Sequence, residues 1–136
     1  MIVVLDASAG IEIVLKRSQS IQLKEKISNS RKVFTTDLYK AEVTNVIGKY
    51  IKAQLITEEK GFDLLNLALA LVDEYYDISQ FTTESLHESI RLDHSAYDMF
   101  YFTLARRSGA ILMTLDKKLM NIAKREGVEA FNPSSD

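Results

Sequence analysis

The stretch Ile2-Val3-Val4-Leu5-Asp6 is a short, continuous apolar run that ends in an acid. Its β-branched residues and its lack of polar alternation predict a strand buried on both faces, as in a parallel sheet. A second run of this kind, residues 110–115, is followed by Asp116. We therefore expect two buried strands that each stop at an aspartate.

Outward from these two runs, short apolar segments alternate with amphipathic ones. Further strands are expected at residues 32–35, 75–78 and 128–131, before a tail at residues 132–136. Helices are expected around residues 11–15 and at 18–30, 38–54, 57–72, 84–92, 97–108 and 117–126. Such alternation predicts an α/β fold of three layers, with helices on both faces of a central parallel sheet of four to five short strands. The first and fourth strands should be parallel neighbours.

Three of these helices carry apolar residues at helical spacing, which predicts their inward faces. The predicted faces are Tyr39, Val43, Val46, Ile47, Tyr50 and Ile51 in the helix 38–54; Phe62, Leu65, Leu69 and Val72 in the helix 57–72; and Tyr97, Phe100, Tyr101, Leu104 and Ala105 in the helix 97–108. Further leucines and alanines make the helix 57–72 apolar almost all round. We therefore expect a homodimer that uses residues 62–72 or the helix 38–54.

The composition is that of an ordinary globular protein, and 136 residues fit one domain spanning 1–136. No linker, repeat or membrane-spanning run interrupts it. Cysteine is absent, which excludes disulfides and thiolate metal sites, and the first apolar run is too short for a signal peptide. These features favour the cytoplasm. The net charge of −2 excludes an overall basic surface, so any contact with nucleic acid must be local.

Acids recur where strands end and where helices begin. Asp6 and Asp116 follow the two buried strands, Asp98 lies in the first turn of its helix, and Glu42 lies one turn into another. Ligands of open α/β sheets bind beyond the carboxyl ends of the strands, and the helices that lead back begin at that same edge. We therefore expect the four carboxylates to converge there.

Converging carboxylates repel one another unless a cation lies between them. Oxygen ligands without a cysteine or a histidine cluster favour Mg²⁺ or Mn²⁺ over zinc. Such a metal polarises a phosphoryl oxygen and activates water, which points to phosphodiester hydrolysis.

Plainer interpretations exist for the same residues. Asp6 and Asp116 are also good helix N-caps, and a glutamate such as Glu42 is by default solvated. His94, close before Asp98, is either a substrate contact or proton carrier or simply a loop residue, and the second interpretation is favoured. Lys117 and Lys118 are candidates for phosphate contact beside Asp116.

Taken together, the motifs resemble the PIN-domain nucleases, and most of all the VapC toxins of toxin–antitoxin modules. The likeness runs from residue 2 to about residue 131 and rests on Val3-Val4-Leu5-Asp6-Ala7-Ser8, Glu42 with Asn45, Tyr97-Asp98 with Tyr101 and Leu104-Ala105, and Thr114-Leu115-Asp116 with Lys117-Lys118-Leu119. The resemblance implies an Mg²⁺- or Mn²⁺-dependent endoribonuclease that forms a homodimer and is neutralised by a cognate antitoxin. It also implies metal-site roles for Asp6, Glu42, Asp98 and Asp116. Ser8, Thr114 and Asn45 match supporting polar positions.

Two other functions compete with this one. A phospho-acceptor signalling domain also gathers acids and a threonine at strand ends, but it would want adjacent acids after the first strand, and Asp6 has no acidic neighbour. A catalytically silent, RNA-binding PIN-like scaffold is the alternative if no metal binds.

Overall fold

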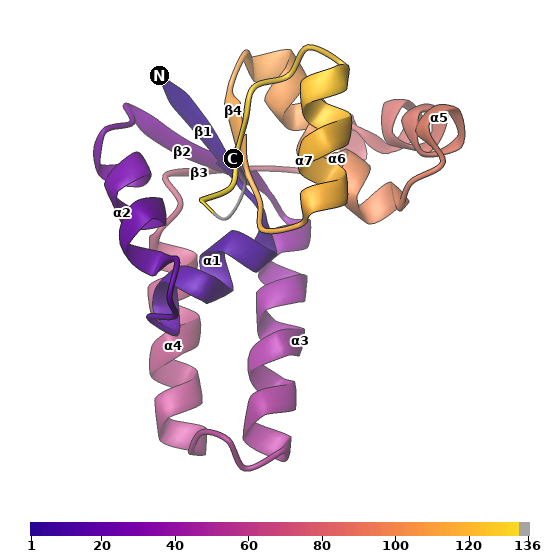
Figure 1. The fold of residues 1–136 in the computed structure, drawn as a ribbon. Helices are drawn as coiled ribbons and strands as arrows, with labels where there is room; N and C mark the ends of the chain where they lie inside the picture. Colours follow the sequence, from indigo (N-terminus) through magenta and orange to yellow (C-terminus); the bar gives the residue numbers. More distant parts are fainter. Residues whose placement is uncertain (134–136) are drawn as a thin grey trace.

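The computed structural model describes residues 1–133 and contains one parallel sheet of five strands (Figure 1). The strands are β1 (Ile2–Leu5), β2 (Lys32–Thr36), β3 (Glu74–Tyr76), β4 (Ile111–Met113) and β5 (Ala130–Phe131), in the order β3-β2-β1-β4-β5. The expected pairing of the first and fourth strands is confirmed, because Leu5 lies beside Met113 in a parallel register. Residues 134–136 of the expected tail lie outside the described residues.

Helices connect the strands throughout the described chain. They are α1 (Ala7–Val14), α2 (Ser20–Ser28), α3 (Leu38–Lys52), α4 (Glu58–Ala70), α5 (Thr82–Leu92), α6 (Ala96–Ser108) and α7 (Lys117–Arg125), with a 3-10 turn, η1, at Ile78–Gln80. Starting from β1, the chain first adds β2 and β3 on one side of the sheet and then adds β4 and β5 on the other side. Right-handed crossovers therefore place α1 to α4 on one face and α5 to α7 on the other, which confirms the three-layer arrangement (Figure 1).

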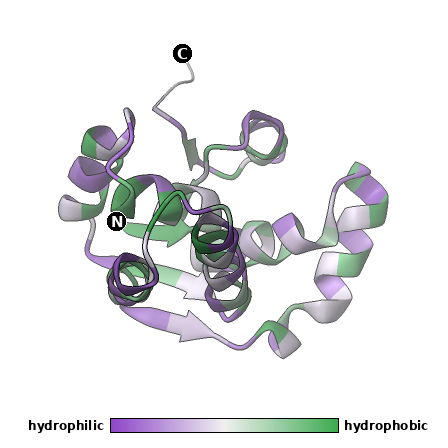
Figure 2. Ribbon diagram, turned by 90° about the horizontal axis from the view of Figure 1, so that it is seen from below, coloured by the Kyte–Doolittle hydropathy of each residue, from purple (hydrophilic) through white to green (hydrophobic). Residues whose placement is uncertain are grey.

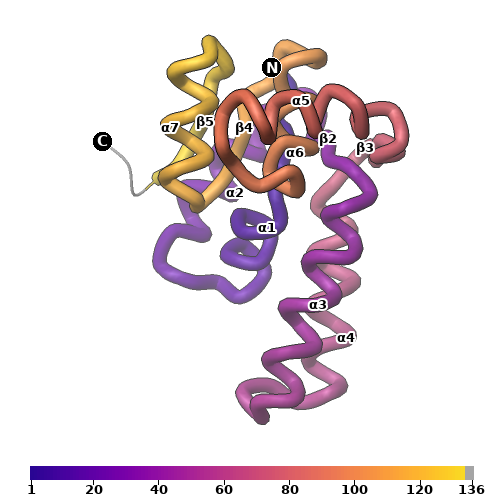
Figure 3. Tube along the Cα trace, turned by 90° about the vertical axis from the view of Figure 1, so that its right-hand side faces the viewer, coloured from indigo at the N-terminus to yellow at the C-terminus, as the bar shows by residue number. Residues whose placement is uncertain are grey.

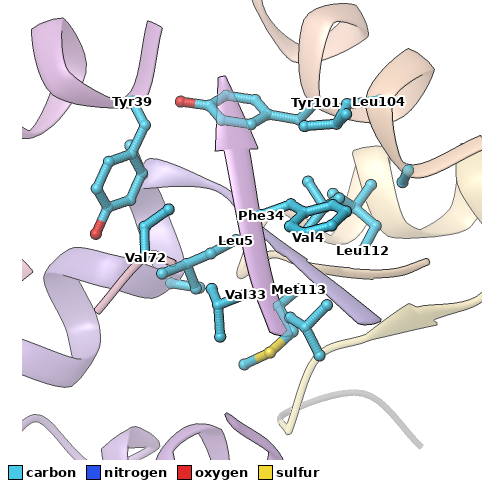
Figure 4. Close-up of a cluster of buried hydrophobic side chains, with 14 of the residues drawn as sticks. Val4, Leu5, Val33, Phe34, Tyr39, Val72, Tyr101, Leu104, Leu112 and Met113 are labelled. Carbon is cyan, nitrogen blue, oxygen red and sulfur yellow. The ribbon is translucent and has the colours of Figure 1, made fainter. Parts of the chain in front are cut away.

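The core lies where both helical layers meet the middle of the sheet. Figure 4 shows side chains of β1, β2 and β4 packed with Tyr39 of α3 and with Tyr101 and Leu104 of α6. The central strands are hydrophobic, while β3 at the edge is partly exposed and more polar (Figure 2). Strand order reverses between β1 and β4, so a crevice beyond their carboxyl ends is the expected place for a ligand.

Helices α3 and α4 form a long hairpin that projects beyond the sheet (Figures 1 and 3). The predicted inward face of α4 is wrong in part: the helix buries Gly61, Leu64 and Ala68, whereas Phe62 is 59% exposed. Close packing explains the difference, because a Cβ on Gly61 would lie 2.4 Å from a methyl of Ile51 in α3. Only small residues let the two helices pack this closely, and a pattern of large apolar residues does not reveal them.

Three local predictions also need correction. The third strand ends at Tyr76 rather than at residue 78, because the Asp77 carboxylate accepts a hydrogen bond from the Ser79 amide (2.9 Å) and starts η1. Helix α5 begins at Thr82, two residues earlier than predicted. Tyr97 is 63% exposed rather than inward, since the first turn of α6 buries Met99, and Tyr97 lies on the other side of the helix. No helix among residues 1–133 is long and apolar enough to cross a lipid bilayer.

Candidate metal centre at the carboxyl edge of the sheet

Asp6 follows β1 directly and is the most buried of the four acids, with 5% of its surface exposed. Its Oδ1 accepts hydrogen bonds from the Ala9 amide (3.0 Å), which caps α1, and from the Ser8 hydroxyl (2.7 Å). Burial raises the pKa of Asp6 to about 7, although these hydrogen bonds and one from Thr114 act in the opposite direction. The carboxylate is therefore held in place at a considerable electrostatic cost.

Asp116 lies beyond the end of the neighbouring strand, three residues after Met113, the last residue of β4. Its Oδ1 caps α7 by accepting hydrogen bonds from the amides of Lys118 (2.9 Å) and Leu119 (3.2 Å). Its own amide donates to the Thr114 hydroxyl (3.0 Å), whose side chain also hydrogen-bonds to Asp6. Both capping aspartates thus emerge from adjacent strands at one edge and share a threonine.

Ser8 makes a second connection between the two strand ends. Its hydroxyl donates to Asp6 (2.7 Å) and accepts a hydrogen bond from the Leu115 amide (3.0 Å). The predicted supporting positions of Ser8 and Thr114 therefore lie within the cluster.

Asp98 occupies the first turn of α6, which Ser95 caps. Its Oδ2 lies 2.7 Å from Nε2 of His94, whose side chain is only 6% exposed. Burial raises the pKa of Asp98, and the negative charge of Asp116 adds to this, while His94 lowers it. Asp98 is thus close to both His94 and Asp116.

Glu42 reaches the same edge from α3. Its Oε1 accepts a hydrogen bond of 2.5 Å from the hydroxyl of Tyr101, a side chain that is 1% exposed. Burial raises the pKa of Glu42, the Tyr101 hydrogen bond lowers it, and the charge of Asp98 raises it again. Tyr101, which belongs to α6 in the opposite helical layer, thereby fixes the Glu42 carboxylate.

The four acids form one electrostatic cluster centred on Asp98, which repels Asp6, Glu42 and Asp116. Within residues 1–133 none of the four is in an ion pair with lysine or arginine. One donor atom from each of His94, Asp98 and Asp116 lies within 4.8 Å of the other two. Asp6 is buried and the other three acids are partly exposed. A group of carboxylates without lysine or arginine partners is suited to holding a cation, and its oxygen-rich donor set fits a hard divalent metal.

The remaining predicted site residues are less closely attached. Asn45 is exposed one turn after Glu42, and Lys117 and Lys118 are exposed at the start of α7. In the described part of the chain, neither a hydrogen bond nor an ion pair joins the side chains of these three residues to the acids, although the backbone amide of Lys118 donates to Asp116. The sequence favoured a plain loop role for His94, and it placed Tyr101 on an inward helix face and in the family motif without a role at the site. The signal available for both residues was their spacing of four and three positions from Asp98.

A cavity of about 370 Å³ opens beside the cluster between α1 and α3. It shares Ser8 and Glu42 with the site, and its lining is otherwise mostly apolar. Arg17 lies at this cavity and hydrogen-bonds through its guanidinium to the Tyr50 hydroxyl. A positive group is thus available in the cavity next to the acids.

Comparison with known proteins agrees with this architecture. Residues 3–125 match the family model described as "PIN domain". The chain is 25% identical over 121 residues to "Ribonuclease VapC3" of Pyrobaculum aerophilum, an alignment that covers 88% of this chain and 92% of that protein.

Solved structures show the same fold. The structure of VapBC2 from Rickettsia felis bound to a DNA fragment from their promoter superposes with a TM-score of 0.70 and 16% identity, covering 97% of this chain and 98% of that chain. Mycobacterium tuberculosis VapC20, a sarcin-ricin loop cleaving toxin, gives a TM-score of 0.71 and 13% identity, covering 96% and 99%.

Proposed function

Because this chain belongs to the PIN domain family, we propose that it is a metal-dependent endoribonuclease that hydrolyses RNA phosphodiester bonds. The observation that supports this most strongly is the convergence of Asp6, Glu42, Asp98 and Asp116 from four separate elements without a lysine or arginine partner. The curated relative is named a ribonuclease, which agrees with an RNA substrate.

The four acids would hold Mg²⁺ or Mn²⁺. When bound, such an ion activates water and stabilises the negative charge that develops on the phosphoryl oxygens. The raised pKa values of Asp6, Glu42 and Asp98 favour this assignment, because a cation relieves the burial and repulsion that raise them.

The protein's own contribution is to keep the carboxylates in position before substrate arrives. Ser8 and Thr114 hold Asp6, the amides at the start of α7 hold Asp116, and Tyr101 holds Glu42. Hydrogen bonds of this kind orient ligands and limit their rearrangement during reaction. Lys117 and Lys118 would contact RNA phosphates from beside Asp116.

Cleavage of a panel of structured and single-stranded RNAs tests this proposal directly. We expect cleavage with Mg²⁺ or Mn²⁺ and none in EDTA, because the acids alone repel phosphate. Cleavage that persists unchanged in EDTA would contradict a metal-dependent reaction. RNA binding without cleavage under any metal would instead favour the catalytically silent scaffold.

We also propose a cytoplasmic toxin whose partner is a cognate antitoxin protein. Support comes from the fold shared with a toxin and with a chain of the VapBC2 assembly. Co-expression with the neighbouring open reading frame should suppress RNA cleavage and yield a co-purifying complex. Full activity in the presence of that product would count against the pairing.

The protein is expected to form a homodimer through α4, because Phe62 and Leu67 expose 59% and 56% of their surface on this projecting hairpin. Light scattering at micromolar concentration should give about twice the chain mass of 15.4 kDa, and the double variant Phe62→Ser, Leu67→Ser should give a monomer.

A second exposed pair, Leu86 and Ile90 on α5, supplies the matched control. Dissociation by Leu86→Ser with Ile90→Ser alone would move the interface to α5, and a monomeric parent would remove the dimer but leave the nuclease proposal standing.

A further inference from the structure

His94 lies in the short connection between α5 and α6, and its backbone is held from both sides by one residue. Its amide donates to the Ser89 carbonyl (3.1 Å), and its carbonyl accepts from the Ser89 hydroxyl (2.6 Å). The preceding residue, Asp93, ends α5 in the left-handed conformation with φ of 50°. The backbone of His94 is therefore fixed by the end of α5.

The imidazole points into the acidic cluster rather than toward solvent. Its side chain is 6% exposed, and Nε2 lies 2.7 Å from Oδ2 of Asp98. A donor atom of Asp116 lies within 4.8 Å of both. A nitrogen donor and two carboxylate donors are thus close enough to share one ion.

We propose that His94 supplies a nitrogen ligand to the metal site and so makes the site prefer Mn²⁺ to Mg²⁺. This inference rests on the metal site of the proposed function and extends it to a residue outside the four acids. Mg²⁺ binds almost entirely through oxygen. A nitrogen donor is better tolerated by transition metals, and of the two ions in the proposed function only Mn²⁺ is one. The sequence alone suggested an all-oxygen site, and the buried ring changes that expectation.

The competing role for His94 is to orient Asp98 by donating a hydrogen bond from Nε2 without touching the metal. That role would affect both metals alike, because it acts through a carboxylate that both would use. The ratio of the two affinities therefore separates ligation from positioning.

The test compares the full-length parent with His94→Leu by calorimetric titration of Mn²⁺ and of Mg²⁺. We expect the Mn²⁺ dissociation constant to rise at least about tenfold in the variant, while that for Mg²⁺ changes much less. Pulsed electron paramagnetic resonance of bound Mn²⁺ should show coupling to a directly bound imidazole ¹⁴N in the parent and none in His94→Leu. Melting curves check that the variant folds.

The chain offers a matched control because it contains two histidines and no cysteine. His87 is exposed on α5, so His87→Leu should leave both affinities and the ¹⁴N coupling unchanged. An equal loss of Mn²⁺ and Mg²⁺ affinity, unchanged affinities, or the absence of ¹⁴N coupling in the parent would each overturn ligation by His94.

These failures differ from a failure of the proposed function. If His94→Leu binds both metals like the parent while Asp98→Asn loses Mn²⁺ binding and RNA cleavage, the nuclease proposal stands and the ligand role of His94 falls. If the parent itself binds neither metal, both fall together.

Discussion

Asp98→Asn is expected to lower the rate of RNA cleavage at least about a thousandfold while leaving the protein folded. The amide keeps the shape of the carboxylate but removes a negative charge from the residue that is electrostatically coupled to the other three acids. Losing about 4 kcal/mol of transition-state stabilisation slows a reaction by about this factor. Stability should stay level or rise, because one member of a repelling cluster is gone.

Asp93→Asn is the matched control for this substitution. Asp93 is exposed five residues away, and its left-handed backbone conformation suits asparagine, so cleavage should be unchanged. Both variants are assayed on the same RNAs with Mg²⁺, with Mn²⁺ and with EDTA, beside melting curves. If Asp98→Asn cuts RNA as fast as the parent, the acids have no part in catalysis.

The metal-free protein is expected to become less stable as pH rises from about 4 to about 7. The pKa of Asp6 is raised from 3.8 to about 7 by burial, so the folded state retains a proton that the unfolded chain has already released. Stability then falls with pH between those two values, by about 4 kcal/mol at most for this one group. The raised pKa values of Glu42 and Asp98 act in the same direction.

Urea unfolding in EDTA at pH 5 and pH 8 measures this effect. The lower limit avoids acid loss of ion pairs such as that of Glu88, whose pKa is lowered by the hydrogen bond from Arg91. Saturating Mn²⁺ should restore stability at pH 8, and Asp6→Asn should flatten the pH dependence. Greater stability at pH 8 than at pH 5 in EDTA would show that Asp6 is not protonated in the folded state.

The layers and the strand neighbours follow from sequence because they depend on patterns within single segments. The buried runs ending at Leu5 and near Leu115 predict central strands, and chain connectivity predicts their parallel pairing. The inward face of α4 does not follow, because it depends on how closely α3 approaches Gly61. That distance belongs to a pair of helices and cannot be inferred from the periodicity of one.

The candidate site likewise contains residues whose positions follow from single segments and residues whose positions depend on contacts between segments. The positions of Asp6, Asp98 and Asp116 follow from where strands stop and helices start, so sequence and topology together bring them to one edge. The approach of His94 depends on its hydrogen bonds to Ser89 and on the left-handed Asp93, which no local pattern predicts. The bond from Tyr101 to Glu42 likewise joins opposite layers of the fold.

The capping hydrogen bonds of Asp6 and Asp116 affect which substitutions in related sequences indicate a loss of catalytic activity. Each aspartate begins a helix as well as facing the cluster, and losing such a cap costs about 1 kcal/mol whether or not a metal binds. A lineage that had lost catalysis would therefore still be selected to keep a capping residue at these two positions, but asparagine or serine would cap as well as aspartate and would remove the buried charge of Asp6. Glu42 and Asp98 cap nothing, so inactive members are expected to vary freely at those two positions and to keep aspartate, asparagine or serine at the positions of Asp6 and Asp116.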